Sequence, residues 1–299
     1  MTKALKPRAA LAAAAALALV AGISVAQRFG GGEMPPGQHY RTGREAESHS
    51  TGTAMWTNDA RFARDVFTFV RIKYTTGGGR SYANPWGDHR WKIDFPDSDL
   101  NLSYRLQQMT SMKVDPDSRV LTLTDKALFD YPWIYIVEAG EWRLTDEEVP
   151  VLRRYLLNGG FLMFDDFWGA AALANVHREL RRVLPERAPV ELPMDHPMFH
   201  CVFDLKGPKE TLQIPNVGQG MRHQYDGVTW EDNHGPGGRE VLFQGIYDDQ
   251  ERMMVFIAHN TDNGDGWERE GEYEYFFKTF SEKIAFPLGI NAIFYSMTH

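Results

Sequence analysis

Acidic and imidazole side chains follow three separate apolar runs of the chain. They are Glu138 at the end of residues 133–138, Asp165 and Asp166 at the end of residues 161–166 with Trp168 close behind, and His259 with Asn260 after residues 253–258. In an open parallel sheet, ligands collect beyond the carboxyl ends of the strands, so these side chains predict one polar crevice. Carboxylates held together can bind a divalent cation or act as an acid and a base. Alternatively, they cap the helices that follow, whose N-termini favour negative charge.

A second group of oxygen ligands lies in the loop that follows His259, with the sequence HNTDNGDGWERE. Asp262 and Asp265 alternate with glycines, as a calcium-binding loop requires, but an EF-hand alignment puts Thr261 where the first aspartate belongs. There are two other interpretations of this loop. It is either a shaped binding loop with Trp267 as an aromatic wall or an ordinary set of turns.

Other motifs give weaker indications. Residues 195–201 contain two histidines and an aspartate, but their spacing differs from HExxH and Pro197 disfavours a helix. Cys201 lies in an apolar run without the glycines of a nucleophile elbow, which predicts a buried, inert thiol. The glycine-rich residues 75–82 lack the Lys-Ser/Thr pair of a phosphate-binding loop.

The elements that must position these residues follow from apolar periodicity. Strands are predicted at 66–74, 120–123, 133–140, 161–166 and on either side of Asp248 and Asp249. Helices are predicted in DFPDSDLNLSYRLQQMTSM, opening near Asp97 or Ser98, and at 145–158 and 173–183. Thr145 and Glu148 form a capping box for the second helix. Near the C-terminus, two helical pieces are expected on either side of Pro287. Alternating strands and helices with nearly unbroken apolar strands predict an α/β three-layer sandwich with a mostly parallel sheet and a small antiparallel part.

Composition limits the classes of function. The chain has 299 residues with 32 Lys and Arg against 40 Asp and Glu, a formal net charge of −8. An acidic protein of this kind has no general attraction to nucleic acid, so no nucleic-acid partner is expected. A single cysteine excludes an intramolecular disulfide and a cysteine-based metal cluster.

The N-terminus has the pattern of an export signal. Three basic residues precede an apolar run from Ala9 to Ala26, which predicts a signal peptide at residues 1–26, cleavage after Ala26 and a periplasmic or secreted protein. The alternative is a retained membrane anchor, the only membrane contact expected. Residues 27–60 are rich in Gly, Ser, Thr and charge and predict a flexible linker, followed by a single α/β domain at 61–299.

Seven strings of the chain, taken together and in order, resemble one bacterial family. They are FVRIKY, DFPDSDLNLSYRLQQMTS, FDYPWIYIVEAG, LRRYLLNGGFLMFDDFWG, DHPMFH, HNTDNGDGWE and LGINAIFYSMTH, within residues 66–299. The chain resembles the domain-of-unknown-function 4159 family. The resemblance implies a glutamine amidotransferase-like, flavodoxin-like fold, export or membrane attachment, and an envelope role near MoxR-type ATPases and von Willebrand-type proteins. Amidotransferase chemistry is not expected, because the chain lacks the cysteine elbow.

Three hypotheses of function follow. The leading one is an exported α/β module that binds an envelope ligand or an envelope protein partner. The second is a metal-assisted hydrolase, with a divalent cation, Asp165 or Asp166 and His259 as base and ligand, and Glu138 as acid. The third is a purely structural scaffold whose acidic strand ends only cap helices.

Overall fold

The computed structural model describes residues 39–299 except 64, 77–86 and 232–233. The expected signal peptide lies outside the described residues. Within the described part of the chain, no helix is both long and apolar enough to cross a membrane.

A seven-stranded sheet forms the centre of the domain, in the order β2-β1-β3-β4-β7-β6-β5. Its strands are β1 (Val70–Ile72), β2 (Arg119–Leu121), β3 (Trp133–Val137), β4 (Phe161–Asp165), β5 (Val190–Glu191), β6 (Leu242–Tyr247) and β7 (Met253–His259). The five strands from β2 to β7 in this order are parallel, whereas β6 and β5 are antiparallel to their neighbours. The predicted mostly parallel sheet with a small antiparallel part is confirmed.

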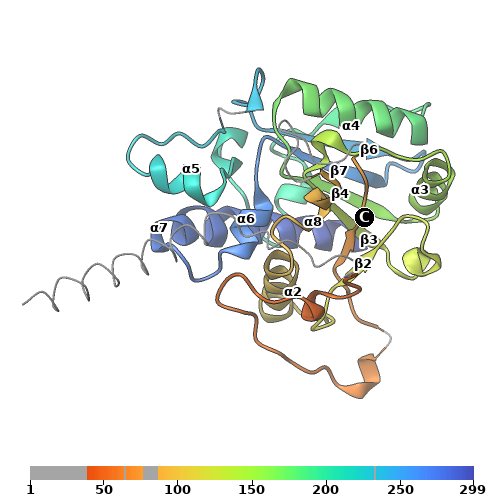
Figure 1. The fold of residues 1–299 in the computed structure, drawn as a ribbon, viewed down its shortest axis with the longest axis horizontal. Helices are drawn as coiled ribbons and strands as arrows, with labels where there is room; N and C mark the ends of the chain where they lie inside the picture. Colours follow the sequence, from red (N-terminus) through yellow and green to blue (C-terminus); the bar gives the residue numbers. More distant parts are fainter. Residues whose placement is uncertain (1–38, 64, 77–86, 232–233) are drawn as a thin grey trace, which may run out of the picture. The chain divides into compact units, whose positions relative to one another are not determined.

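Helices cover both faces of this sheet (Figure 1). They are α2 (Asp97–Met109), α3 (Glu148–Leu157), α4 (Gly169–Val183), α5 (Val217–Arg222), α6 (Asn263–Glu268), α7 (Glu274–Phe276), the π-helical segment Phe277–Ala285 and α8 (Phe286–Thr298). Short 3-10 turns lie at Gly43–Glu45, Ala60–Phe62, Gly87–Lys92, Lys126–Asp130, Ala139–Glu141, Pro197–Phe199 and Lys209–Leu212. Helices α2, α6 and α8 pack together on one face, and α3 packs with α4 on the other, which makes a three-layer α/β sandwich.

Burial on both faces explains why the central strands are apolar throughout. In β3, Trp133 and Tyr135 join the core cluster that includes Leu102 of α2 and Trp267 of α6. Ile134 and Ile136 alternate with them and are also fully buried. Every residue of β3, β4 and β7 is buried, as expected for parallel strands covered by helices on each side.

Two local signals from the sequence are confirmed and two differ. The Thr145–Glu148 capping box forms, with both reciprocal hydrogen bonds at 2.8 and 3.2 Å. A tight turn after Asp248 joins β6 and β7. However, the i, i+4, i+7 spacing of Leu102, Leu106 and Met109 predicts one apolar stripe, whereas Met109 is the last residue of α2 and is 45 % exposed. Pro287 does not separate two helices, because the π-helical segment Phe277–Ala285 continues directly into α8, of which Pro287 is the second residue.

Residues 41–58, which composition assigns to a linker, contact the domain at many points. Gly43 is buried, and Arg41 and Gly43 exchange backbone hydrogen bonds with the strand that contains Ser118 and Val120. Ser48 Oγ and the His49 N–H donate to Asp97, each at 2.6 Å. The Trp56 indole donates to the carbonyl of Val114 at 2.9 Å, with Trp56 packed against the core. Polar side chains and backbone groups make most of these contacts, so the hydropathy of the sequence does not reveal that this segment is attached to the domain.

A fully buried ion pair holds the loop between β1 and α2. Arg71 of β1 and Asp99 of α2 are both 0 % exposed, and the guanidinium contacts both carboxylate oxygens. Its remaining N–H groups donate to the carbonyls of Trp91 and Ile93 at 3.0 and 2.9 Å and to Ser98 Oγ at 2.8 Å. All five donors of the guanidinium are therefore used, which is the condition for a buried charge to be tolerated.

Arg71→Ala is expected to destabilise the domain by about 3–5 kcal/mol, because it leaves the Asp99 carboxylate buried without a partner. Chemical denaturation measures the change in free energy of unfolding. Lys278→Ala is the control, since Lys278 pairs with Glu282 on the surface and such pairs contribute about 1 kcal/mol or less. Equal effects of the two substitutions would contradict a central role for the buried pair.

Candidate functional site

Three strands end in sharp turns at the same edge of the sheet. Glu138 after β3, Asp166 after β4 and Asn260 after β7 have φ angles of 52°, 50° and 57°. A non-glycine residue in the left-handed region is uncommon, and three at neighbouring strand ends mark this edge as a built site. The backbone therefore turns sharply at the ends of the three strands whose side chains the sequence predicts to lie together.

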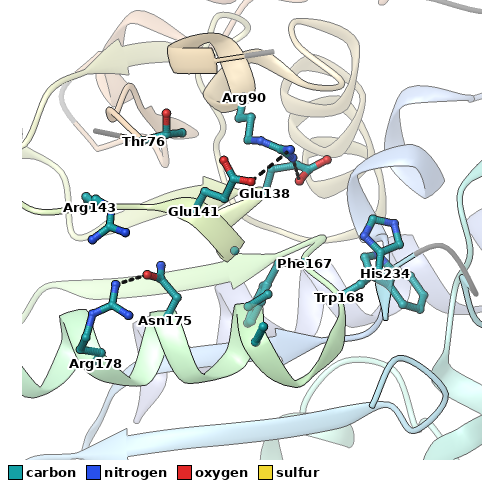
Figure 2. A pocket seen from close by; sticks show the side chains of 13 residues that line it. Thr76, Arg90, Glu138, Glu141, Arg143, Phe167, Trp168, Asn175, Arg178 and His234 are labelled. Carbon is teal, nitrogen blue, oxygen red and sulfur yellow. Dashed lines mark hydrogen bonds and ion pairs between the residues drawn. The ribbon is translucent and has the colours of Figure 1, made fainter. Parts of the chain in front are cut away.

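A pocket of about 440 Å³ lies at this edge (Figure 2). It is lined by Thr76, Arg90, Glu138, Gly140, Glu141, Arg143, Phe167, Trp168, Ala171, Ala172, Asn175, Arg178 and His234. In the strand order, β1 connects to β2 on one side of the sheet and β3 connects to β4 on the other side. The pocket lies at this reversal, next to the ends of β1 and β3. Ligands of open α/β sheets bind at this kind of switch point.

One wall of the pocket carries an ion-pair network. Arg90 Nη1 lies 2.6 Å from Glu138 Oε2, and Arg90 Nη2 lies 3.7 Å from Glu141 Oε1. Burial raises the pKa of Glu138, while the charge of Arg90 opposes this shift. The pair is only about one-fifth exposed, so its charges act at short range on whatever enters the pocket.

The opposite end of the pocket gathers two further guanidinium groups. In Figure 2, Arg143 and Arg178 both lie beside Asn175. Arg178 donates to Asn175 Oδ1 and to Glu179 at 3.3 Å. The guanidinium of Arg143 has no hydrogen bond or ion pair among the described residues, although its backbone N–H donates to Thr75. At this end of the pocket, the guanidinium of Arg143 therefore has no partner among the described residues.

Trp168 and His234 form the third side. Their rings stack with centroids 6.1 Å apart and an interplanar angle of 27° (Figure 2). The Trp168 indole donates to Asp166 Oδ1 at 3.1 Å, and His234 Nε2 lies 2.9 Å from Glu231. Burial lowers the pKa of His234, but the hydrogen bond and charge of Glu231 outweigh it, and the pKa is raised overall.

Behind Trp168 lies a cluster of buried carboxylates. Asp94, Asp166 and Asp262 can bring one oxygen each to within 4.8 Å of one another, and Asp94, Asp265 and Glu268 do the same. Burial is the first cause that raises the pKa of Asp166 and of Asp262, and neighbouring carboxylates raise both further. Oxygen-only groups of this kind are the ligands of Mg²⁺, Mn²⁺ and Ca²⁺.

Two of the candidate residues stabilise the backbone behind the site. Asp165 accepts hydrogen bonds from the Tyr135 hydroxyl at 2.9 Å, from the Asn263 amide at 2.7 Å and from the Gly264 N–H at 3.0 Å. Burial raises its pKa to about 6 against these donors. Asn260 accepts from the N–H of Gly169 and donates to the carbonyls of Gly237 and Glu240. Asp165 thus caps α6, and Asn260 joins three loops.

His259 and Trp267 also lie away from the pocket. His259 is 3 % exposed, and its Nε2 donates to the carbonyl of Gly169 at 3.0 Å. Trp267 is fully buried, and its indole donates to the carbonyl of Ala285 at 2.8 Å, so it is a core residue rather than the wall of a cleft. Asp262 and Asp265 belong to the carboxylate cluster, and Asp262 also accepts from the N–H of Asp265 at 2.7 Å.

Sequence reasoning missed the partners that complete the site. Asp94 lies in a string, DFPDSD, that reads as a helix start, and only its fold-dependent approach to α6 reveals it. Arg90 lies in the 3-10 turn Gly87–Lys92, and Arg143 and His234 lie between the named elements, so no apolar periodicity marks them. The rule that places ligands beyond the carboxyl ends of strands indicates the segments after β1 and β3, but not which of their side chains line the pocket.

Comparison with protein families gives a match over most of the chain. The model of a family described as a domain of unknown function, DUF4159, covers residues 68–297. A search of curated proteins found no match.

The buried imidazole predicts a measurable acid sensitivity. Burial lowers the pKa of His259 from 6.5 to about 4, so the unfolded chain takes up this proton first as the pH falls. Its contribution to stability is fully present above pH 6.5 and is lost progressively down to about pH 4, by about 3 kcal/mol at most. His259→Gln, whose amide can still donate to Gly169, is expected to give a shallower loss of unfolding free energy between pH 7 and 4.5 in urea titrations.

His200→Gln is the control for this experiment. The Met194 carbonyl and Asp204 raise the pKa of His200, so its contribution to stability is present at low pH and lost as the pH rises. Removal of His200 therefore does not flatten the acid limb. A wild-type slope in His259→Gln would show that His259 does not contribute to acid sensitivity.

Proposed function

The chain belongs to the DUF4159 family, and we propose that it is an exported α/β module that binds a small anionic ligand in the pocket at the carboxyl edge of its sheet. The observation that carries the proposal is the arginine-lined end of that pocket. Arg143 brings a guanidinium without a partner among the described residues, and Arg178 lines the same cavity.

The charges of the pocket suggest the chemistry of the ligand. A carboxylate or phosphate group fits between Arg143 and Arg178, because a guanidinium binds either group with paired hydrogen bonds. At the other wall, Glu138 and Glu141 are hydrogen-bond acceptors for hydroxyl or amino groups of the same ligand. A volume of about 440 Å³ suits a molecule the size of a monosaccharide acid or a small phosphorylated metabolite.

The contacts of His259 favour binding over the metal-assisted hydrolase hypothesis. That hypothesis needs His259 as base or metal ligand, but His259 Nε2 contacts the Gly169 carbonyl, and His259 belongs neither to the lining of the pocket nor to a carboxylate triplet of the described residues. The sole cysteine gives no support to amidotransferase chemistry either. Cys201 Sγ donates to the carbonyl of Asn291 at 3.3 Å, and burial raises the pKa of its thiol.

The scaffold hypothesis explains only part of the edge. Asp165 and Asn260 do cap and join backbone segments, as a scaffold would require. A scaffold needs no hollow lined by three arginines, and a helix cap does not explain Arg143, whose side chain contacts no backbone carbonyl among the described residues. These features support a binding role for the pocket in addition to its structural residues.

We expect D-glucuronate, a carboxylate-bearing sugar, to bind more tightly than neutral D-glucose, and inorganic phosphate to compete with it. Isothermal titration and the shift in melting temperature measure binding. At ten times its Kd, a ligand stabilises the folded state by about 1.4 kcal/mol. Arg143→Ala is expected to weaken glucuronate binding about tenfold or more, because one charge-assisted contact is lost.

Arg181→Ala is the matched control. Arg181 lies on the exposed side of the same helix as Arg178 and outside the pocket, so its removal changes the net charge alone. Two results would refute the proposal: equal binding of glucuronate, phosphate and glucose, or an Arg143→Ala variant that binds like Arg181→Ala.

Export is part of the proposal and has its own test. Cleavage after Ala26 predicts a mature chain that begins at Gln27, which intact-mass measurement of the periplasmic or secreted fraction would detect. Ala26→Trp is expected to block processing, since signal peptidase requires a small residue there, whereas Gln27→Asn is expected to be processed normally. A full-length chain recovered from the cytoplasm would contradict export, and one recovered from the membrane would indicate a retained anchor.

A further inference from the structure

Three carboxylates from distant segments meet behind the ligand pocket. Asp94 comes from the loop before α2, Asp166 from the turn after β4, and Asp262 from the turn after β7. One oxygen of each lies within 4.8 Å of the other two. Oxygens that share one Mg²⁺, Mn²⁺ or Ca²⁺ ion at about 2.0–2.6 Å are separated by no more than about 5 Å, so this spacing fits a common ion.

The second carboxylate triplet at this place already has a cation. Asp94, Asp265 and Glu268 also approach within 4.8 Å, but Arg269 Nε lies 2.9 Å from Glu268 and 3.7 Å from Asp265. The guanidinium of Arg269 thus supplies the positive charge that a metal ion would otherwise supply to Asp265 and Glu268. This distinction selects Asp94, Asp166 and Asp262 as the triplet that lacks a counter-charge.

The charged neighbours of the selected triplet are mostly acids. Glu138, Glu231 and Asp165 all act on Asp166, and Asp265 and Glu231 act on Asp262, each raising the pKa. At Asp94, Arg71 and Arg269 oppose this effect, but both are already paired with other carboxylates. Three buried carboxylates without a cation repel one another at short range, where the effective dielectric constant is low.

An unused oxygen gives independent evidence of a ligand. Asp94 Oδ2 is buried and has no hydrogen-bond partner among the described residues, with Asp94 only 9 % exposed. Asp165, the neighbour of Asp166 in the sequence, shows the contrast, since three groups donate to it. A buried carboxylate oxygen without a donor is costly, and a bound cation removes this cost.

The surrounding residues leave room for Asp94 to reach this position. A Cβ added to Gly264 would lie 2.1 Å from Asp94 Oδ2, so only glycine at this position allows the approach. The other two carboxylates are oriented by one donor each: the Trp168 indole donates to Asp166 Oδ1, and the Asp265 N–H donates to Asp262 Oδ1. Each thereby keeps one oxygen available, as in metal sites whose ligands are held by outer hydrogen bonds.

We propose that Asp94, Asp166 and Asp262 bind one hard divalent cation, Mg²⁺, Mn²⁺ or Ca²⁺. Oxygen-only ligands favour these ions over softer metals that prefer sulfur or imidazole. The proposal does not depend on the anionic ligand, because the ion bridges three segments of the protein itself. Through Trp168, which contacts Asp166 and lines the pocket, the bound ion would also fix one wall of the ligand site.

The first test measures cation binding by the EDTA-treated protein. Isothermal titration with MgCl₂, MnCl₂ and CaCl₂ is expected to show one site per chain for at least one ion, with a rise in melting temperature. Asp94→Asn is expected to weaken this binding about tenfold or more, while the cation-free variant stays at least as stable as the cation-free wild type, because one buried charge is removed.

Glu268→Gln is the matched control, since Glu268 is an equally buried carboxylate that pairs with Arg269 instead. It is expected to keep the cation site. Absence of binding, or equal binding by wild type and Asp94→Asn, would overturn the proposal. Loss of binding in Glu268→Gln as well would assign the ion to the other triplet and overturn this assignment.

A measurement on the wild type alone keeps the test independent of variant folding. Tb³⁺, a hard cation with luminescence that a nearby indole can excite, is expected to give tryptophan-sensitised emission that saturates at one equivalent and is displaced by Ca²⁺. Emission that never saturates would indicate scattered surface binding, and absent emission would indicate no site near Trp168. Either result would refute the proposal.

Discussion

The buried pair between Arg71 and Asp99 is the constraint on which the carboxyl edge of the sheet depends. It joins a strand to the first turn of a helix and also binds the carbonyls of Trp91 and Ile93, which fixes the loop that ends in Asp94. Replacing water around a guanidinium requires complete pairing, and this pairing determines the course of the backbone over nine residues. The position of Asp94 among the other acids follows from that course.

Two electrostatic environments lie side by side at this edge. The pocket carries arginines at its walls, whereas the charged groups that act most strongly on Asp166 in the described part of the chain are carboxylates. Trp168 separates them: its indole N–H binds Asp166, and its ring stacks on His234, which in turn pairs with Glu231. Trp168 and His234 therefore connect the two environments by direct contacts.

The sequence predicts the sheet and the positions of its strand ends but not the identity of every working residue. Periodicity finds β3, β4 and β7 because each is buried on both faces, and it places Glu138 and Asp166 at their ends. It does not distinguish an aspartate that caps a helix, such as Asp165, from one without donors, such as Asp94. That distinction depends on tertiary contacts between residues 30, 98 and 99 positions apart, which no local pattern records.

The two borders of the sheet are also protected. On one side, Arg41 and Gly43 pair with the backbone of β2, and on the other the outermost strand, β5, has only two residues. Long unpaired strands invite edge-to-edge association with other chains, and short or covered ones prevent it. The segment that contains Arg41 and Gly43 thus covers the edge strand β2. A chain without this segment would expose the unpaired backbone N–H and C=O groups of β2 to other chains.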